Sequence, residues 1–206
     1  LKAFYADSAT MSATLSSSRG YDVPGLLRWL DRYPYGCLEQ TVSRAMPLLY
    51  FNDLALLSSV DEDESIRPRI QSAIDRVLDM QSNSGGFGMW GPYDYRADTW
   101  LGTYAVDFLV RAQDQDYVVP NASIDRSLNW LKQIAGQGRR ELWMRAYAFH
   151  VLAKSGAANP GDVRYFFDTK LEKIENPLAA AHLGAALTDV GDLARANVAY
   201  SRAMEL

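Results

Sequence analysis

A set of aromatic and aliphatic residues occurs twice in this chain of 206 residues, at a separation of 43 positions. The first copy is Trp100, Tyr104, Ala105 and Leu109, and the second is Trp143, Tyr147, Ala148 and Leu152. A weaker third copy, displaced by 35 positions, relates Leu152 and Gly156 to Leu187 and Gly191. A repeat of this length is typical of a helix pair, which buries its apolar face only against a neighbouring pair. The chain is therefore predicted to be all-α, with helix pairs that stack into a solenoid or close into a ring.

Apolar residues at helical spacing predict two of these helices directly. One apolar stripe consists of Ile66, Ile70, Ala73, Ile74, Val77 and Leu78. The other begins after Pro120-Asn121 and consists of Ile124, Leu128, Leu131 and Ile134. Short segments rich in glycine, asparagine and proline separate the predicted helices. Residues 1–18 differ, because they are rich in serine and threonine and alternate weakly, which predicts a short β-like or extended lead-in.

The segment Gln-Ser-Asn-Ser-Gly-Gly-Phe-Gly-Met-Trp, residues 81–90, favours a closed ring over an open solenoid. It resembles the loops of α/α toroids, a class that includes terpenoid cyclases, protein prenyltransferase β subunits and thioester-containing domains. The fold class predicted here is accordingly an α/α toroid built from helix pairs.

Composition excludes several kinds of partner. The chain is 48% hydrophobic and 22% charged, with a formal net charge of −4, which is ordinary for a globular protein. No basic cluster is present that would bind nucleic acid, so no nucleic-acid partner is expected. No apolar run approaches the length of a membrane span, and we expect no direct membrane contact by this domain.

Cys37 is the single cysteine, so an internal disulfide is excluded. It is then a buried apolar residue, a free thiol, a metal ligand with distant partners, or part of another covalent bond. Gln40 lies three positions later, and residues at this spacing face each other in a helix or tight turn. Attack of the thiol on the Gln40 carboxamide, with loss of ammonia, would give an internal thioester that closes a ring through Leu38 and Glu39. Gly36 is expected to let the chain enter this turn without Cβ strain.

The stretch Tyr-Pro-Tyr-Gly-Cys-Leu-Glu-Gln, residues 33–40, resembles the thioester motif of bacterial α2-macroglobulins. The loop at 81–90 and the segment Trp-Leu-Gly-Thr-Tyr-Ala, residues 100–105, are similar to the same domain. The resemblance implies a thioester domain over residues 19–206, truncated at its C-terminus so that the ring is incomplete. It also implies that residues 1–18 lead in from a neighbouring β-rich domain.

The resemblance implies a broad-spectrum protease inhibitor that acts once, rather than an enzyme that turns over. In the family, cleavage of a bait region exposes the thioester, and an amine of the attacking protease is acylated. Here Gln40 would carry the new amide and Cys37 would become a free thiol. The implied partners are host or competitor proteases and other domains of the full-length protein, with no cofactor and no metal. The implied setting is bacterial defence in the periplasm, with the full-length protein anchored to the inner membrane as a lipoprotein.

The family resemblance also assigns a shield and a target. Tyr33 occupies the place of a tyrosine that guards the thioester, and Tyr35 is the second candidate. Some relatives use a downstream histidine to direct the thioester to hydroxyl groups, but the matching turn at residues 136–141 has none. Amines are therefore the expected targets, and His150 and His182 are interpreted as core or lining residues.

Three alternative functions stay open from the sequence. A terpenoid cyclase would need an acidic cluster inside the ring, whereas residues 61–64 (Asp-Glu-Asp-Glu) are typical of a solvated linker. A prenyltransferase-like subunit would need clustered zinc ligands, and one cysteine with two distant histidines is a poor supply. The remaining alternative is a non-catalytic helical repeat that binds a partner, in which Cys37 is a small buried residue.

Overall fold

The computed structural model describes residues 36–50, 66–94, 99–138 and 140–206. Its regular elements in these ranges are α2 (Leu38–Leu48), α4 (Ile66–Leu78), α5 (Thr99–Asp114), α6 (Asn121–Gly136), α7 (Leu142–Lys154), α8 (Pro160–Lys170), the 3₁₀ turn η1 (Leu171–Lys173), α9 (Pro177–Asp189) and α10 (Leu193–Glu205). One isolated antiparallel bridge, Gln81 to Phe87, occurs in the same ranges. The all-α prediction is confirmed for the described residues. The predicted lead-in at 1–18 and its boundary lie outside them.

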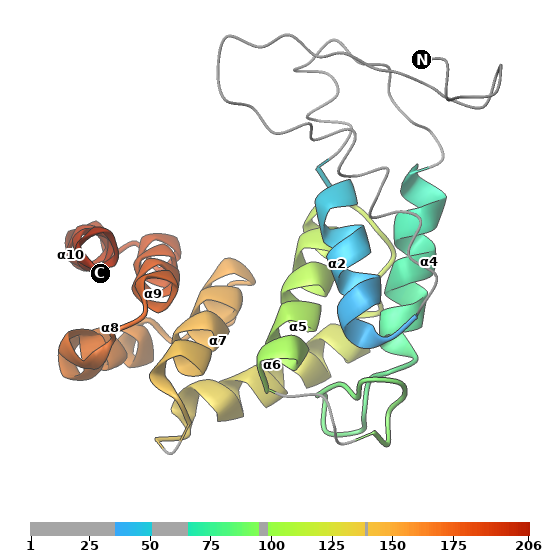
Figure 1. The fold of residues 1–206 in the computed structure, drawn as a ribbon, viewed down its shortest axis with the longest axis horizontal. Coiled ribbons are helices and arrows are strands. Elements are labelled where there is room, and N and C mark those ends of the chain that lie inside the picture. Colours follow the sequence, from blue (N-terminus) through green and yellow to red (C-terminus); the bar gives the residue numbers. More distant parts are fainter. Residues whose placement is uncertain (1–35, 51–65, 95–98, 139) are drawn as a thin grey trace, which may run out of the picture. The chain divides into compact units, whose positions relative to one another are not determined.

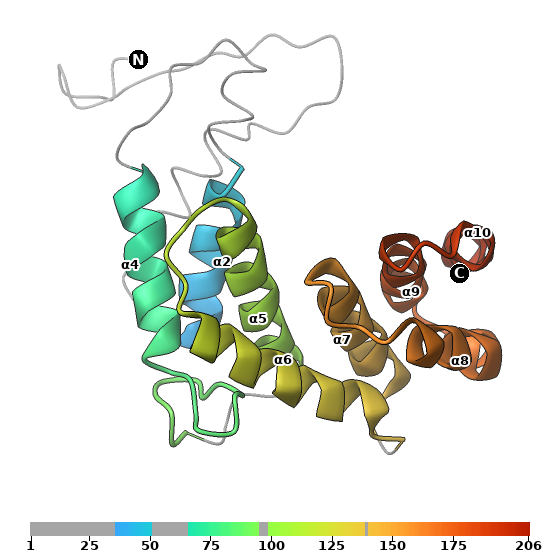
Figure 2. The same ribbon diagram turned by 180° about the vertical axis from the view of Figure 1, so that it is seen from behind.

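The helices form two layers (Figures 1 and 2). In the first layer α2 contacts α5, α5 contacts α7, and α7 contacts α9. The second layer consists of α4 against α2, α6 against α5 and α7, and α8 and α10 against α9. This alternation of inner and outer helices is the arrangement expected of an α/α toroid. The described helices all belong to one unit, Pro34–Leu206, with α2 and α10 towards opposite ends of the row.

The repeat in the sequence corresponds to the inner layer. Its three copies lie on α5, α7 and α9, and each of these helices ends in the same way. The residue after the C-cap has positive φ in all three, at Asp116 (61°), Gly156 (71°) and Gly191 (79°). The next amide in each case donates to a carbonyl five residues earlier, as in the Schellman motif: Tyr117 to Ala112, Ala157 to Leu152, and Asp192 to Leu187. The shared ending turns the chain into the next outer helix.

The two predicted apolar stripes are the buried faces of outer helices. On α4 the side chains of Ile70, Ile74 and Val77 are fully buried. On α6 that of Leu131 is fully buried and that of Ile134 is almost so. Burial of one such side chain stabilises the fold by roughly 1.5–3 kcal/mol. Both helices are therefore held by the inner layer against which these stripes pack.

The predicted turns also provide helix caps. The side chain of Asn159 accepts a hydrogen bond from the Gly161 amide at the start of α8, and that of Asn176 accepts one from the Ala179 amide at the start of α9. In both helices a proline occupies the first position, where its missing N–H costs nothing. These caps fix where an outer and an inner helix begin.

Candidate functional site

Cys37 and Gln40 occupy two matched positions at the start of α2. Cys37 is the N-cap residue, with extended backbone angles (φ −73°, ψ 164°), and Gln40 is the third residue of the helix. These are the two positions of the capping box, in which the N-cap side chain accepts from the backbone N–H of the third helical residue and that residue's side chain reaches back to the N-cap backbone N–H. Here the two positions hold a thiol and a carboxamide, and the Cys37 side chain makes no capping hydrogen bond.

The Cys37 side chain and the side-chain oxygen of Gln40 are both withdrawn from solvent. Cys37 is a free cysteine that is 7% exposed. The side-chain oxygen of Gln40 is buried and has no hydrogen-bond partner among the described residues. An unpaired buried amide oxygen costs about 1–3 kcal/mol, so the carboxamide form of Gln40 is not well accommodated at this position.

Backbone groups of the motif are fixed by hydrogen bonds. The Leu38 amide donates to the Met89 carbonyl (2.9 Å), and the Thr41 amide and hydroxyl both donate to the Cys37 carbonyl (2.9 Å each). No described residue accepts a hydrogen bond from the amides of Glu39 and Gln40. These two N–H groups lie at the positive end of the helix dipole, where they favour a thiolate or a polarised acyl oxygen.

The motif is also tied to the outer layer. The guanidinium of Arg76 on α4 donates from Nε and Nη2 to the Gly36 carbonyl oxygen, at 3.2 Å each. Among the described residues, a Cβ added at Gly36 would lie 3.8 Å from Arg76 Nε, which is ordinary van der Waals contact. The expectation that Gly36 eases entry into the turn stays a prediction, because the residue before it lies outside the described ranges.

The loop at 81–90 lies against α6 and reaches the motif through Met89. The side-chain nitrogen of Gln81 (Nε2) donates to the Ser123 backbone carbonyl (2.9 Å) and to the Ser127 hydroxyl oxygen (2.8 Å). Gly85 has φ +90°, and a Cβ there would lie 2.1 Å from the Arg126 carbonyl oxygen. The glutamine and glycine of this segment thus allow the loop to approach α6 closely, which positions the Met89 carbonyl for Leu38.

The remaining predicted site residues divide into two groups. Leu38 is fully buried, and exposed Glu39 accepts a hydrogen bond from the Ser43 hydroxyl (3.0 Å). Tyr33 and Tyr35, the predicted shield, lie outside the described residues.

A polar network on the inner helices was not predicted from the sequence. Asp107 of α5 is 4% exposed and forms an ion pair with Arg111 (2.7 Å). Its second oxygen accepts from the Tyr147 hydroxyl of α7 (3.0 Å), and Arg111 donates to the Tyr50 hydroxyl (2.9 Å). The i,i+4 spacing of Asp107 and Arg111 was a visible signal, but spacing alone does not indicate burial.

The two histidines extend this network towards α9. The His182 ring stacks on Tyr147 (centroids 4.5 Å apart) and on His150 (5.4 Å). Burial, then the neighbouring His150, lowers the pKa of His182 to about 4, and burial lowers the pKa of His150. Both are therefore neutral lining residues, as interpreted from the sequence, although Nδ1 of His150 is buried without a partner among the described residues.

In residues 36–50, 66–94, 99–138 and 140–206, no group of three or more His, Cys, Asp or Glu side chains is placed to hold a metal ion. Across the same residues no helix has the length and apolar character needed to span a membrane.

Comparison with known sequences places the motif in context. Residues 4–141 match the family model described as A-macroglobulin TED domain. Alpha-2-macroglobulin of Escherichia coli (strain K12) is 32% identical over 93% of this chain, and alpha-2-macroglobulin of Xylella fastidiosa (strain Temecula1) is 30% identical over 92%. The chain spans 12% of the length of each of these two relatives.

Solved structures agree with this match. Native alpha-2-macroglobulin from Escherichia coli, solved from domain MG7 to the C-terminus, has a TM-score of 0.79 and 32% identity; the match covers 89% of this chain and 31% of that one. Salmonella alpha-2-macroglobulin reacted with methylamine has a TM-score of 0.76 and 34% identity, covering 89% of this chain and 13% of that one. The inner and outer helices described above therefore have the arrangement of a TED domain, an α/α toroid.

Proposed function

Because the chain belongs to the α2-macroglobulin family and corresponds to its TED domain, we propose that Cys37 and Gln40 form an internal thioester that covalently traps proteases. The observation that carries the proposal is the pairing of a buried thiol at the N-cap of α2 with a buried, unpartnered carboxamide oxygen three residues later. The cyclase, prenyltransferase and binding-repeat alternatives do not account for this pairing.

Formation of the bond follows from the groups present. The Cys37 sulfur attacks Cδ of Gln40, the C–N bond of the carboxamide breaks, and ammonia leaves with the thiol proton. The positive end of the α2 dipole, where the Glu39 and Gln40 amides are not paired with described residues, favours the negative charge of the tetrahedral intermediate. A thioester oxygen is a weaker hydrogen-bond acceptor than an amide oxygen, so the product suits the unpartnered position better than the carboxamide does.

Trapping transfers the acyl group of Gln40 from sulfur to nitrogen. An amine of the target attacks Cδ of Gln40, the C–S bond breaks, and an amide forms while Cys37 is released as a thiolate. The proton lost by the amine leaves with solvent or protonates the thiolate. The start of α2 favours the departing thiolate, because its N–H groups and dipole stabilise negative charge. The domain acts once, since no step restores the thioester.

Amines are the proposed targets. Neither histidine among the described residues lies on α2 or on the 81–90 loop that contacts the motif; both belong to the stack between α7 and α9. The turn before α7 also lacks the histidine that would transfer the acyl group to a hydroxyl. A lysine side chain on the surface of a protease is the expected nucleophile.

Intact mass spectrometry of freshly purified full-length protein tests the thioester. We expect the measured mass to be lower than the encoded mass by one ammonia. Methylamine should then add to Gln40 and expose one thiol that reacts with a maleimide. An encoded mass that matches the measured one, with a thiol already titratable, would contradict the proposal.

The role of the full-length protein is a wider proposal that the family supports. It comprises bait-region cleavage by host or competitor proteases, inhibition after covalent capture, and defence from the periplasm by a lipoprotein on the inner membrane. Incubation of the full-length protein with trypsin, followed by a denaturing gel, tests capture: a band at the summed mass is expected. Cell fractionation tests the location.

A further inference from the structure

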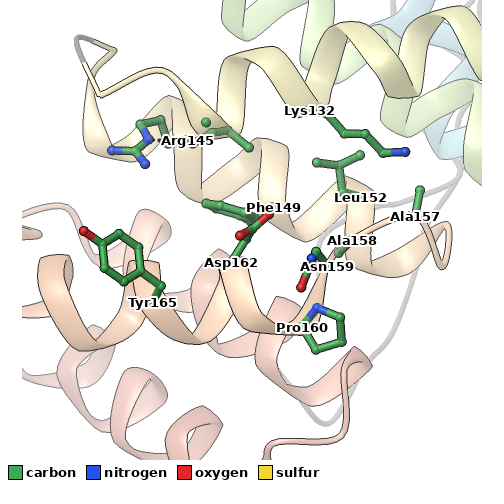
Figure 3. Close-up of a pocket in the computed structure, with 12 residues that line it drawn as sticks. Lys132, Arg145, Phe149, Leu152, Ala157, Ala158, Asn159, Pro160, Asp162 and Tyr165 are labelled. Atoms are coloured by element: carbon green, nitrogen blue, oxygen red, sulfur yellow. Dashed lines mark hydrogen bonds between the residues drawn. The ribbon is translucent and has the colours of Figure 1, made fainter.

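A pocket of about 770 Å³ opens between α6, α7 and α8, away from the Cys37 motif in the sequence and lined by none of its residues. Figure 3 shows Arg145 and Tyr165 at one end and Lys132 with the turn at 157–160 at the other. Apolar lining comes from Ala135, Phe149, Leu152, Ala157, Ala158 and Pro160. The volume is in the range of small-molecule and peptide side-chain sites, roughly 300–1,000 Å³.

Arg145 is the unusual member of this lining. It is 7% exposed, and its Nε donates to the Ala135 carbonyl at 2.8 Å, near the C-terminus of α6. Its guanidinium lies 4.6 Å above the Phe166 ring. No described residue accepts a hydrogen bond from its Nη atoms, and none of the described carboxylates forms an ion pair with it. Burial lowers the pKa of Arg145, as expected for a cation that lacks a counter-ion.

The other charged lining residues do not neutralise this cation. Lys132 adds a second positive charge and Asp162 a single negative one, which leaves one unit of positive charge in the pocket. The Tyr165 ring lies at the Arg145 end, and the residue is 67% exposed, so its hydroxyl is available as a further donor. A singly charged anion with two acceptor oxygens matches this set of donors.

We propose that this pocket binds a carboxylate carried on an apolar or aromatic body, with the carboxylate on the Nη atoms of Arg145 and the body on Phe149 and Leu152. A guanidinium pairs with a carboxylate through two parallel hydrogen bonds, which uses the donors that the protein leaves unpaired. A phosphate would bring a second negative charge towards Asp162, whereas a carboxylate balances the charge of the lining. The proposal is independent of the thioester chemistry.

The test is an NMR titration of the 206-residue chain with two matched probes, N-acetylphenylalanine and N-acetylphenylalaninamide. We expect saturable shifts at Arg145 Nε–H and at the amides of residues 157–162 with the acid. The amide should bind about tenfold more weakly, because it offers no charged acceptor. Equal affinity for the two probes, or no saturable shift with the acid, overturns the proposal.

Two variants localise the effect. Arg145→Lys keeps the positive charge and removes the paired N–H donors of the guanidinium. It should weaken binding of N-acetylphenylalanine about tenfold and leave binding of N-acetylphenylalaninamide unchanged. Because Arg145 also contacts α6, its replacement can affect the fold as well as binding. Tyr165→Phe therefore serves as a second variant on an exposed residue, and it should weaken binding of the acid only. Tyr93→Phe, an exposed tyrosine outside this pocket, is the matched control. If Tyr165→Phe and a folded Arg145→Lys variant both bind the acid with the wild-type affinity, the assignment is wrong.

A second probe pair identifies the source of the carboxylate. The peptide acetyl-Phe-Glu-Phe-amide is compared with acetyl-Phe-Gln-Phe-amide. Preference for the glutamate peptide supports an acidic side chain of a protein segment as the ligand, and binding of N-acetylphenylalanine alone supports a free or terminal carboxylate. Failure of both acidic probes to bind better than their amides contradicts the proposal.

Discussion

The Leu38 amide donates a hydrogen bond of 2.9 Å to the Met89 carbonyl oxygen, which joins the first residue of α2 to the glycine-rich loop. This bond satisfies one of the N–H groups that every helix start leaves unpaired. It also fixes the helix start from which Cys37 and Gln40 project. The geometry of the motif therefore depends on a loop that lies more than 40 positions further along the sequence.

The first prediction concerns that loop. Gly88→Ala should destabilise the protein by about 1–3 kcal/mol, because an added Cβ would lie 2.0 Å from the Gly91 carbonyl oxygen and force the loop to move. The displaced Met89 carbonyl should also shorten the lifetime of the thioester. Urea unfolding and the rate of thiol release measure the two effects. Gly91→Ala is the control, since a Cβ there meets no atom of the described residues within 4 Å; equal effects of the two changes would contradict the prediction.

The second prediction separates the two reacting residues. Cys37→Ala should abolish adducts that survive denaturation while leaving the helical fold nearly intact, because the change removes the nucleophile and little volume. Gln40→Ala should also abolish adducts, yet leave a thiol that a maleimide labels at once. Gels after protease treatment and circular dichroism provide the readouts. Persistent adducts in either variant would show that capture does not use the thioester.

Much of this arrangement was predictable because local patterns determine it. The stripes from Ile66 and Ile124 predicted α4 and α6. The i,i+3 spacing predicted that Cys37 and Gln40 face each other in a helix or a tight turn, and the two residues lie in the first turn of α2. Such periodicities depend only on the geometry of one helix. The repeat identified the inner helices because equivalent positions in each copy bury the same face.

Contacts between distant segments were not predictable in the same way. The bond between Leu38 and Met89 and the network around Asp107 require knowledge of which helices pack together. An aspartate and an arginine four residues apart are typical of an exposed helix face, and only the packing of α7 on α5 buries Asp107. The positive φ of Asp116 was also missed, since glycine marks this position in the other two copies and aspartate does not.

The third prediction uses that difference. Asp116→Gly should raise the free energy of unfolding by about 0.5 kcal/mol, because aspartate tolerates the left-handed region less well than glycine does. The reciprocal change Gly156→Asp should cost about 1 kcal/mol, although a Cβ there has open space around it. Thermal or urea unfolding measures both. A destabilised Asp116→Gly variant would mean that the aspartate side chain contributes more than its backbone strain costs.

The fourth prediction tests the proposed shield in the full-length protein. Tyr33→Ala should speed hydrolysis and methylamine uptake before any protease cleaves the bait region, because water then reaches the acyl carbon. Capture should fall through early loss of the bond. Tyr35→Ala is the neighbouring control. If both variants keep the wild-type thioester lifetime and folding, neither tyrosine protects the bond, and protection has to come from another domain.

The fifth prediction concerns pH and the stacked histidines. Burial holds the pKa of His182 at about 4, below its ordinary value of 6.5, so between these values the unfolded chain binds more protons than the folded one. The contribution of His182 to the free energy of unfolding is therefore fully present above pH 6.5, and stability should fall by about 1 kcal/mol per pH unit as the pH decreases towards 4.

The groups that face His182 are His150, Asp107, Arg111 and Tyr147. Because His150 also has a lowered pKa, its titration adds to the same slope. The charge of Asp107 raises the pKa of both histidines and so makes the slope smaller. Urea unfolding across this range measures the slope, which His182→Gln should reduce. A variant whose stability falls as steeply as that of the wild type would assign the dependence to other groups.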